Sequence, residues 1–185
     1  MTAEGDGSTR QLALPFAYVP RFRVEDFIAA PSNDEARAWL GRTASWPAGR
    51  LALYGEPGCG KTHLLQLWAE RTGALLLDGP ALRCLPELAG SPAIALDDAD
   101  AAPDETVLLH LINLAAEMRR PLLLVGRTAP ARWPIALPDL ASRLRAMTAV
   151  AVRPAEDPLL RALLARLLSE RQLVLGESLQ DWLLA

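Results

Sequence analysis

Lysine is almost missing from this chain: the 185-residue sequence contains a single one, Lys61. The 19 basic residues are outnumbered by 22 acidic ones, which gives a formal net charge of −3. No lysine- or arginine-rich tract stands out among them. The composition therefore argues against duplex DNA binding through a broad basic face.

Cysteine is also rare, and long apolar runs are missing. Cys59 and Cys84 are too few to form a metal site alone, and they fit a reduced, cytoplasmic protein. The polar residues 1–10 have no apolar core of the kind found in a signal peptide. No run reaches 18 apolar residues, so we expect no membrane-spanning helix.

Apolar residues make up 51% of the chain, enough to bury the core of one domain. Short apolar runs alternate with segments of helical periodicity, which predicts βαβ units and a parallel sheet. We expect strands over 51–54, 74–77, 93–96, 122–125 and 149–152. We expect helices over 33–40, 61–72, 104–119, 137–145, 157–171 and 178–184, with Ser32 or Asn33 capping the first and Asp157 capping the fifth. Residues 1–10 are typical of a disordered tail.

The strongest motif is the run Gly-Glu-Pro-Gly-Cys-Gly-Lys-Thr at 55–62. It has the Walker A pattern, and it follows an expected strand and opens an expected helix, as this motif requires. The glycines let backbone N–H groups turn toward phosphate oxygens, Lys61 adds a positive charge, and Thr62 can bind Mg²⁺. The predicted nucleotide-binding set is Gly55, Pro57, Gly58, Cys59, Gly60, Lys61, Thr62 and His63.

A second motif, Ile94-Ala95-Leu96-Asp97-Asp98, is a buried run that ends in acids. Beside a Walker A loop this pattern indicates Walker B, in which Asp97 would hold Mg²⁺ and Asp98 would orient the attacking water. The alternative is a pair of acids that cap a loop. Aspartate at the second position is one methylene shorter than the glutamate common in hydrolysing relatives, which favours weak intrinsic hydrolysis.

Three further segments leave alternatives open. After the expected strand 122–125, Arg127 or Thr128 could reach a bound γ-phosphate, although a plain turn is the simpler interpretation. Arg143 lies in an expected short helix. Two interpretations stay open for it: an arginine finger that enters the nucleotide site of a neighbouring protein, and an ordinary surface residue. Residues 11–16, with Gln11, Leu14 and Phe16, form either a docking peptide or a strand that packs on its own domain.

Taken together, residues 11–185 resemble the AAA+ module of the DnaA/Hda family of bacterial replication proteins. The resemblance is carried by Gln11-Leu12-Ala13-Leu14-Pro15-Phe16, Pro31-Ser32-Asn33, both Walker motifs, Leu108-Leu109-His110-Leu111-Ile112-Asn113 and Leu137-Pro138-Asp139-Leu140-Ala141-Ser142-Arg143-Leu144. It implies an AAA+ P-loop NTPase with a five-stranded parallel sheet flanked by helices, over 17–154, and the start of a helical lid over 155–185.

The resemblance, closest to the Hda branch, also implies a function. Such proteins bind the sliding clamp through a hexapeptide like 11–16, carry ADP or ATP with Mg²⁺, and place an arginine finger in the nucleotide site of DnaA. By that resemblance Gln11, Leu14 and Phe16 contact the clamp, Arg143 is the finger, and Phe27 and Ile28 flank the adenine. It implies no sequence-specific DNA contact of its own, and a homo-oligomer is compatible with it.

Three departures from the family matter. The short segment 79–92 lacks the helical insertion with which initiators contact single-stranded DNA, and no helix-turn-helix follows. Val125-Gly126-Arg127 stands where the family has a polar strand end, and the chain ends before a second sensor arginine. Two alternatives to a regulator therefore stay open: an autonomous ATPase similar to helicase loaders, and a non-catalytic clamp- or DnaA-binding module with a structural ADP.

Overall fold

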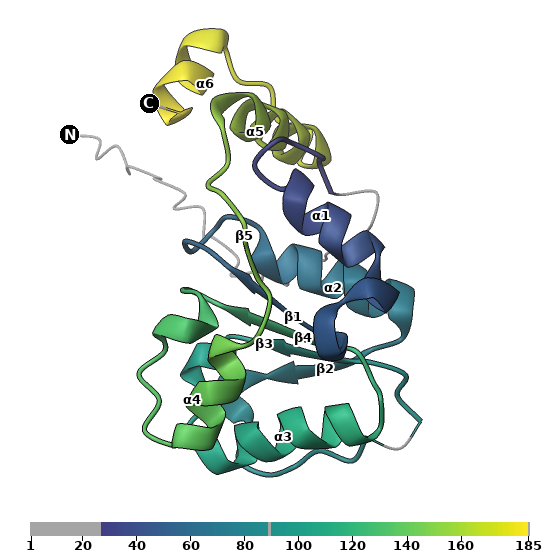
Figure 1. Ribbon diagram of the computed structural model, residues 1–185. Helices are drawn as coiled ribbons and strands as arrows, with labels where there is room; N and C mark the ends of the chain where they lie inside the picture. The colour runs from purple at the N-terminus through teal and green to yellow at the C-terminus, as the bar shows by residue number, and fades with distance from the viewer. Residues whose placement is uncertain (1–26, 89, 185) are drawn as a thin grey trace, which may run out of the picture.

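The computed structural model describes residues 27–88 and 90–184 (Figure 1). Five parallel strands form one sheet in the spatial order β2-β3-β4-β1-β5. In chain order they are β1 (Arg50–Tyr54), β2 (Leu75–Asp78), β3 (Ile94–Asp97), β4 (Leu122–Gly126) and β5 (Ala149–Ala151). The strand that carries Walker A and the strand that carries Walker B are thus separated by β4.

Among the described residues one α-helix precedes β1, three lie between strands, and two follow β5. They are α1 (Asp34–Gly41), α2 (Lys61–Thr72), α3 (Glu105–Glu117), α4 (Pro138–Arg145), α5 (Asp157–Glu170) and α6 (Glu177–Leu184). Short 3-10 turns occur at η2 (Thr43–Ser45), η3 (Pro47–Gly49), η4 (Gly79–Ala81), η5 (Ala99–Ala101) and η6 (Pro130–Arg132). None of the described helices combines the length and the hydropathy needed to cross a membrane.

Helices cover both faces of the sheet, and the side chains of β4 alternate between them. Leu122 and Leu124 pack in a core cluster with residues of α3 and α4, whereas Leu123 and Val125 pack in a second cluster with residues of α1 and α2. Figure 1 shows the two helical layers on opposite sides of the strands. Because both faces are covered, β4 is buried along its whole length and reads as a continuous apolar run.

The predicted fold class is confirmed: each expected strand and helix is present, with ends that differ by one or two residues. One predicted cap is wrong. Glu156, with extended φ and ψ of −80° and 159°, is the N-cap of α5, and Asp157 lies in the first turn. An acid there still interacts favourably with the helix dipole, which is why the sequence pattern points to either position.

The last two helices lie beyond the sheet. Arg161 Nη1 donates to Asp181 Oδ1 at 2.7 Å and joins α5 to α6. No residue of α5 is fully buried, and Trp182 of α6 is 73% exposed. This part of the chain therefore contributes little to the two core clusters.

Candidate nucleotide-binding site

The phosphate loop connects β1 to α2 at the carboxyl edge of the sheet. Lys61, the first residue of α2, is only 8% exposed. Its Nζ donates to the carbonyl oxygens of Gly55 at 2.8 Å and Glu56 at 2.9 Å, and lies 3.7 Å from Cys59 Sγ. A buried ammonium group needs such partners, because desolvation without them is costly. The only lysine is thus held inside the curve of the loop.

The three loop glycines are needed for two different reasons. Gly58 and Gly60 have φ of +81° and +94°, a region that side chains disfavour. Gly55 has no positive φ; instead, a Cβ atom there would lie 2.3 Å from the carbonyl oxygen of Val152, just after β5. The expectation that all three glycines serve backbone curvature is therefore correct for two of them, and Gly55 is a close-packing position.

The N-terminus of α2 fits a phosphate group. Its N-cap is Gly60, which has no side chain to accept a hydrogen bond from the first-turn N–H groups. In most helices an N-cap side chain satisfies one of these donors, and an anion can take its place. Together with the Lys61 ammonium group, these donors form an arrangement suited to a nucleotide phosphate.

Asp97, the last residue of β3, lies across from this helix terminus. Burial raises the pKa of the Asp97 carboxyl, and this effect outweighs hydrogen bonds from the Thr62 side chain and the Asp98 backbone, which lower it. The Asp98 N–H donates to Asp97 Oδ1 at 3.1 Å. Asp97 and Thr62 are therefore adjacent, as a shared Mg²⁺ site requires.

A magnesium ion at this position would need ligands beyond the protein. The described residues contain no group of three or more histidine, cysteine, aspartate or glutamate side chains able to hold a metal. Mg²⁺ commonly binds one or two protein oxygens and takes the remaining ligands from phosphate and water. Thr62 and Asp97 fit that role.

Asp98 has an unusual backbone conformation, with φ and ψ both at 44°. Its carbonyl group lies against Gly79, the residue after β2, where a Cβ atom would be 2.1 Å from the Asp98 oxygen. Non-glycine residues in this region cost of order 1–3 kcal/mol and persist where the surrounding structure fixes them. The contact of Gly79 with Asp98 is set by the tertiary structure.

Of the two predicted adenine contacts, Phe27 touches the helix that follows the phosphate loop. The Phe27 ring meets the His63 ring edge to face, with centroids 5.1 Å apart. Asn33 is the N-cap residue of α1, one of the two predicted, but its side chain accepts no hydrogen bond from the helix. Its Nδ2 donates to the Ile28 carbonyl and its Oδ1 accepts the Ala30 N–H. Buried Asn33 therefore shapes the segment that carries both predicted adenine contacts.

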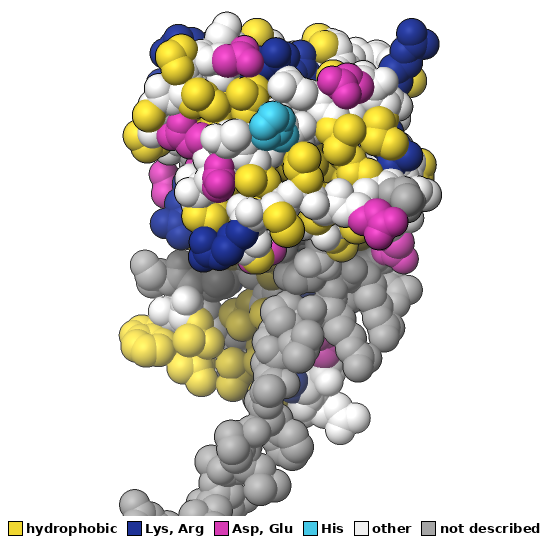
Figure 2. Space-filling model, turned by 90° about the horizontal axis from the view of Figure 1, so that it is seen from below, with side chains coloured by type: hydrophobic (Ala, Val, Ile, Leu, Met, Phe, Trp, Pro, Cys, Tyr) yellow, Lys and Arg dark blue, Asp and Glu magenta, His cyan; other side chains and the backbone are white. Residues whose placement is uncertain are grey.

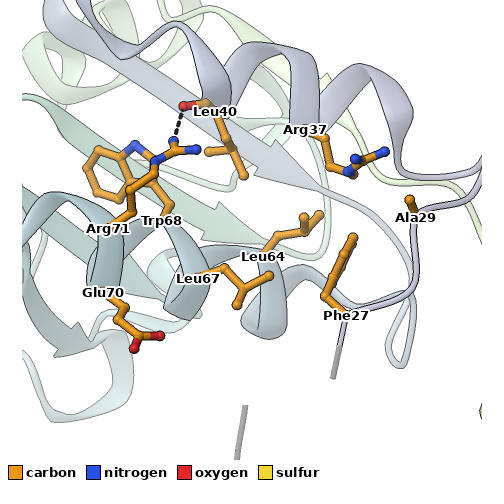
Figure 3. Close-up of a pocket in the computed structure, with 9 residues that line it drawn as sticks. All are labelled: Phe27, Ala29, Arg37, Leu40, Leu64, Leu67, Trp68, Glu70 and Arg71. Atoms are coloured by element: carbon orange, nitrogen blue, oxygen red, sulfur yellow. Dashed lines mark hydrogen bonds between the residues drawn. The ribbon is translucent and has the colours of Figure 1, made fainter. Parts of the chain in front are cut away.

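A cavity of about 650 Å³ opens between α1 and α2 (Figure 3). Phe27, Leu40, Leu64, Leu67 and Trp68 supply its apolar lining, and Arg71 closes one end by donating to the Leu40 carbonyl. The lining includes no residue of the phosphate loop. Phe27, which lines the cavity, also contacts His63 of the predicted nucleotide site, so the two places are neighbours.

Arg143 lies on α4, which packs on the other face of the sheet from α2. Its side chain is 37% exposed, and its Nε donates to Asp139 Oδ1 at 3.2 Å, one helical turn earlier. The start of α4 is held by Glu105 of α3, whose carboxylate accepts the N–H groups of Ala136 at 3.0 Å and Leu137 at 2.7 Å. Glu105 therefore fixes the start of the helix that carries Arg143, a role that no local sequence pattern indicates.

The structure brings most of the predicted site residues together and leaves others apart. The carboxyl edge of the sheet carries the loop residues, Thr62, Asp97 and Asp98. Phe27 lies next to this group because its ring contacts the ring of His63. Arg143 belongs to a different surface. The predicted clamp contacts Gln11, Leu14 and Phe16 lie outside the described residues.

Figure 2 shows the face formed on the α3 side of the sheet. Acidic, basic and hydrophobic side chains are interspersed there, and the described residues form no continuous basic area on that face. This distribution agrees with the small negative net charge of the whole chain.

Comparison with solved structures shows that this fold resembles that of DnaA replication initiators. The chain superposes on a replication initiator DnaA bound to AMPPCP and single-stranded DNA with a TM-score of 0.69 at 19% identity, over 90% of this chain and 60% of that one. Domain III of Thermotoga maritima DnaA gives 0.72 at 18% identity, over 91% and 82%. AMPPCP-bound DnaA from Aquifex aeolicus gives 0.70 at 17%, over 88% and 59%.

No protein-family model and no curated protein matches the sequence. The chain spans about 60% of the length of the first DnaA structure. At these identities the likeness concerns the fold, and it agrees with the parallel sheet and the phosphate loop described above. The protein has the AAA+ P-loop NTPase fold, similar to that of the DnaA initiators.

Proposed function

We propose that this chain is an adenine-nucleotide-binding AAA+ regulator of replication initiation, which binds the sliding clamp and promotes ATP hydrolysis on DnaA in trans. The observation that carries the proposal is the buried Lys61 within a phosphate loop on a DnaA-like fold. DnaA structures of this fold bind AMPPCP, which supports ADP or ATP as the ligand here. In this proposal the protein acts in the cytoplasm.

Each part of the site has a role in nucleotide binding. The loop residues Gly55 to Thr62 and His63 surround the phosphates, Thr62 and Asp97 hold Mg²⁺, and Phe27 and Ile28 contact the adenine. Mg²⁺ would neutralise phosphate charge when bound. The Asp97 carboxylate and the Thr62 hydroxyl, already hydrogen-bonded to each other, are placed to receive it.

The regulatory role depends on Arg143. An arginine that acts in trans has to lie on the surface, and Arg143 is partly exposed on α4, away from the chain's own phosphate loop. Its ion pair with Asp139 is the exchangeable kind found on surfaces, so a phosphate of the partner could replace the aspartate. Clamp binding by Gln11, Leu14 and Phe16 would bring this surface to DnaA on DNA.

Two features distinguish the proposed regulator from an initiator. Between β2 and β3 the described residues form only the short turn η4, so no helix is present there to contact single-stranded DNA. The net charge of −3 also gives no general attraction for DNA. We accordingly propose no sequence-specific DNA contact by this chain.

A second candidate function is an autonomous ATPase. It is favoured by one observation: Asp97 ends β3 and Asp98 follows it, with Lys61 close enough to Asp97 to interact with its charge. In that case Asp98 would act as the base that orients water within this protein. Asp98→Asn should then abolish ATP turnover by the isolated chain.

The experiment that tests the proposal measures ATP turnover by DnaA in the presence of clamp, DNA and this protein. Arg143→Ala should remove nearly all of the stimulation, because such fingers supply about 10³–10⁵ in rate. Arg145→Ala, an exposed arginine on the same helix, is the matched control and should keep it. Nucleotide binding by this chain should be equal in both variants.

Two further variants separate the candidates. Phe16→Ala should reduce stimulation when the reaction depends on the clamp, without affecting nucleotide binding. If Arg143→Ala stimulated ATP turnover by DnaA as fully as the wild type does, Arg143 would not be the finger. If Phe16→Ala released the clamp while neither Arg143→Ala nor Asp98→Asn had an effect, the chain would be a binding module with a structural nucleotide.

A further inference from the structure

The helix that carries Arg143 does not cap its own N-terminus. Leu137 is the N-cap residue of α4, and its side chain offers no hydrogen-bond acceptor. Pro138, at the first helical position, has no N–H group. The acceptor comes from α3 instead: Glu105 Oε1 accepts the Ala136 N–H at 3.0 Å, and Oε2 accepts the Leu137 N–H at 2.7 Å. The two carboxylate oxygens thus bind consecutive N–H groups at the start of α4.

The main chain at Glu105 is itself fixed. Glu105 is the first residue of α3 and follows the N-cap Asp104, whose Oδ1 accepts the N–H groups of Thr106 at 2.8 Å and Val107 at 3.1 Å. Later residues of α3 pack in one of the two core clusters. A charged acceptor makes stronger hydrogen bonds than a neutral one and interacts favourably with a helix N-terminus. The start of α4 is therefore bound to a part of the molecule that has little freedom to move.

The segment 127–137, which joins β4 to α4, is held at both ends by the chain that follows Walker B. At its start the Arg127 N–H donates to Asp100 Oδ2 at 2.9 Å, and at its end Glu105 binds two N–H groups. Between these ends the buried Trp133 packs in the core and its Nε1 donates to the Thr128 carbonyl at 2.9 Å. Removal of the Glu105 carboxylate should therefore free only the part of the segment next to α4.

Core packing alone leaves α4 some freedom along its axis. Leu140 and Leu144, four residues apart, are buried in the core cluster and decide which face of the helix is turned outward. Apolar packing is not directional, so it fixes the position along the axis less sharply than two hydrogen bonds do. Arg143 follows Leu137 by six residues, or about 9 Å along the axis. A shift of the helix along its axis would displace Arg143 by the same distance.

We propose that Glu105 positions the Arg143 finger for the nucleotide site of DnaA by fixing α4 along its axis. The inference rests on the proposed action of Arg143 in trans and adds a residue from another helix to it. Glu105 touches no reacting atom, so it is a positioning residue. A displacement of a catalytic group by about 1 Å can cost about a hundredfold in rate.

ATP turnover by DnaA, titrated with the full chain in the presence of clamp and DNA, tests this assignment. Glu105→Ala should lower the maximal stimulated rate about tenfold to a hundredfold and leave the half-saturating concentration within about twofold, because the finger is misplaced and clamp binding is unchanged. Glu105→Gln keeps one acceptor oxygen in the same shape and should lose less. Glu117→Ala, an exposed glutamate at the other end of α3, is the matched control and should stimulate as the wild type does.

Two further measurements distinguish positioning from a general loss of structure. In Glu105→Ala, backbone hydrogen exchange over 136–145 should become faster, while exchange in the phosphate loop and the calorimetric affinity for magnesium nucleotide stay as in the wild type. Glu105→Ala added to Arg143→Ala should cause no further loss of stimulation, because the residue acts only through the finger. A further loss in the double variant would overturn the inference.

The outcomes also separate this inference from the proposed function. If folded Glu105→Ala has a lower melting temperature but stimulates fully, while Arg143→Ala does not stimulate, Glu105 is only structural and the finger stands. If Arg143→Ala stimulates fully, both proposals fall. Should Glu105→Ala fail to fold, Glu105→Gln decides: full stimulation together with faster exchange over 136–145 would overturn the positioning role.

Discussion

Lys61 and Arg143 are the two cations on which the proposed function depends, and the molecule holds them in opposite ways. Lys61 is buried, with its ammonium group bound to two main-chain carbonyls that cannot move without moving the loop. Arg143 is partly exposed and paired with one carboxylate on its own helix. A group that serves its own site can be fixed by the backbone, whereas a group that serves a partner has to be available at the surface.

The same contrast extends to the segments around them. Near Lys61, Gly55 and Gly79 allow main chains to approach more closely than any side chain would permit. Near Arg143, the Glu105 carboxylate holds the start of α4 in addition to the core packing of Leu137 and Leu140. The two glycine positions should therefore be sensitive to small changes in volume, and the start of α4 to loss of the Glu105 carboxylate.

The largest effect is expected at Lys61. Lys61→Ala should weaken the binding of magnesium adenine nucleotides at least about a hundredfold, because hydrogen bonds to charged groups contribute about 1.5–3 kcal/mol each. Calorimetry with saturating Mg²⁺ measures this. Arg143→Ala serves as the control in the same titration and should bind as the wild type does. If Lys61→Ala bound the nucleotide with unchanged affinity, Lys61 would not serve the chain's own site. The contrast between Lys61 and Arg143 would then be lost.

A second prediction concerns close packing beside Walker B. Gly79→Ala should lower the free energy of unfolding by about 1–3 kcal/mol, because the new Cβ atom would overlap the Asp98 carbonyl. Gly41→Ala, at the end of α1, meets nothing within 4 Å and should be neutral or slightly stabilising. Chemical denaturation of the two variants in parallel checks the pair, and equal stabilities would contradict the packing argument.

The third prediction uses the Asp97 carboxyl. Burial raises its pKa, so between the unfolded value of 3.8 and the higher folded value the folded state binds more protons than the unfolded state. The stability of the nucleotide-free protein should accordingly fall as pH rises through that interval. Asp97→Asn removes this loss, so the variant should be at least as stable as the wild type at pH 7, and the difference should shrink below pH 3.8.

The same substitution, which should not lower the stability of the nucleotide-free protein at pH 7, should weaken its binding of nucleotide. Mg²⁺ prefers a charged oxygen, so Asp97→Asn should weaken nucleotide binding in the presence of Mg²⁺ and have little effect with EDTA. Thermal unfolding across pH gives the first measurement and calorimetry gives the second. A variant that is less stable at pH 7 without Mg²⁺ would contradict burial as the dominant cause.

The smallest effect is expected at the ion pair that holds Arg143. Asp139→Ala should change stability by less than about 0.5 kcal/mol, since exposed i,i+4 pairs contribute little. Stimulation of DnaA turnover should be kept or rise by up to about twofold, because Arg143 no longer has to leave a partner. Glu170→Ala breaks a similar pair with Arg166 on α5 and should change neither quantity. A large loss of stimulation in Asp139→Ala would mean that the pair orients the finger instead of restraining it.

Much of the site was predictable because its signals are local. The Walker A spacing fixes a strand, a loop and a helix within a few neighbouring residues, and the structure has all three there. Asp97, which was expected to come directly after a buried strand over 93–96, is the last residue of β3. Glu105 and Asp100 could not be identified in this way, since each acts on a backbone N–H group about 30 residues away in sequence.

By itself the sequence determined the alternation of strands and helices, the place of the phosphate loop and the two acids at the end of β3. Each of these depends on short-range periodicity and turn chemistry. The tertiary structure decided which residues meet: Gly55 with Val152 just after β5, Gly79 with Asp98, and the Arg127 N–H with Asp100. These contacts follow from the strand order, and no local pattern encodes which parallel strands become neighbours in the sheet.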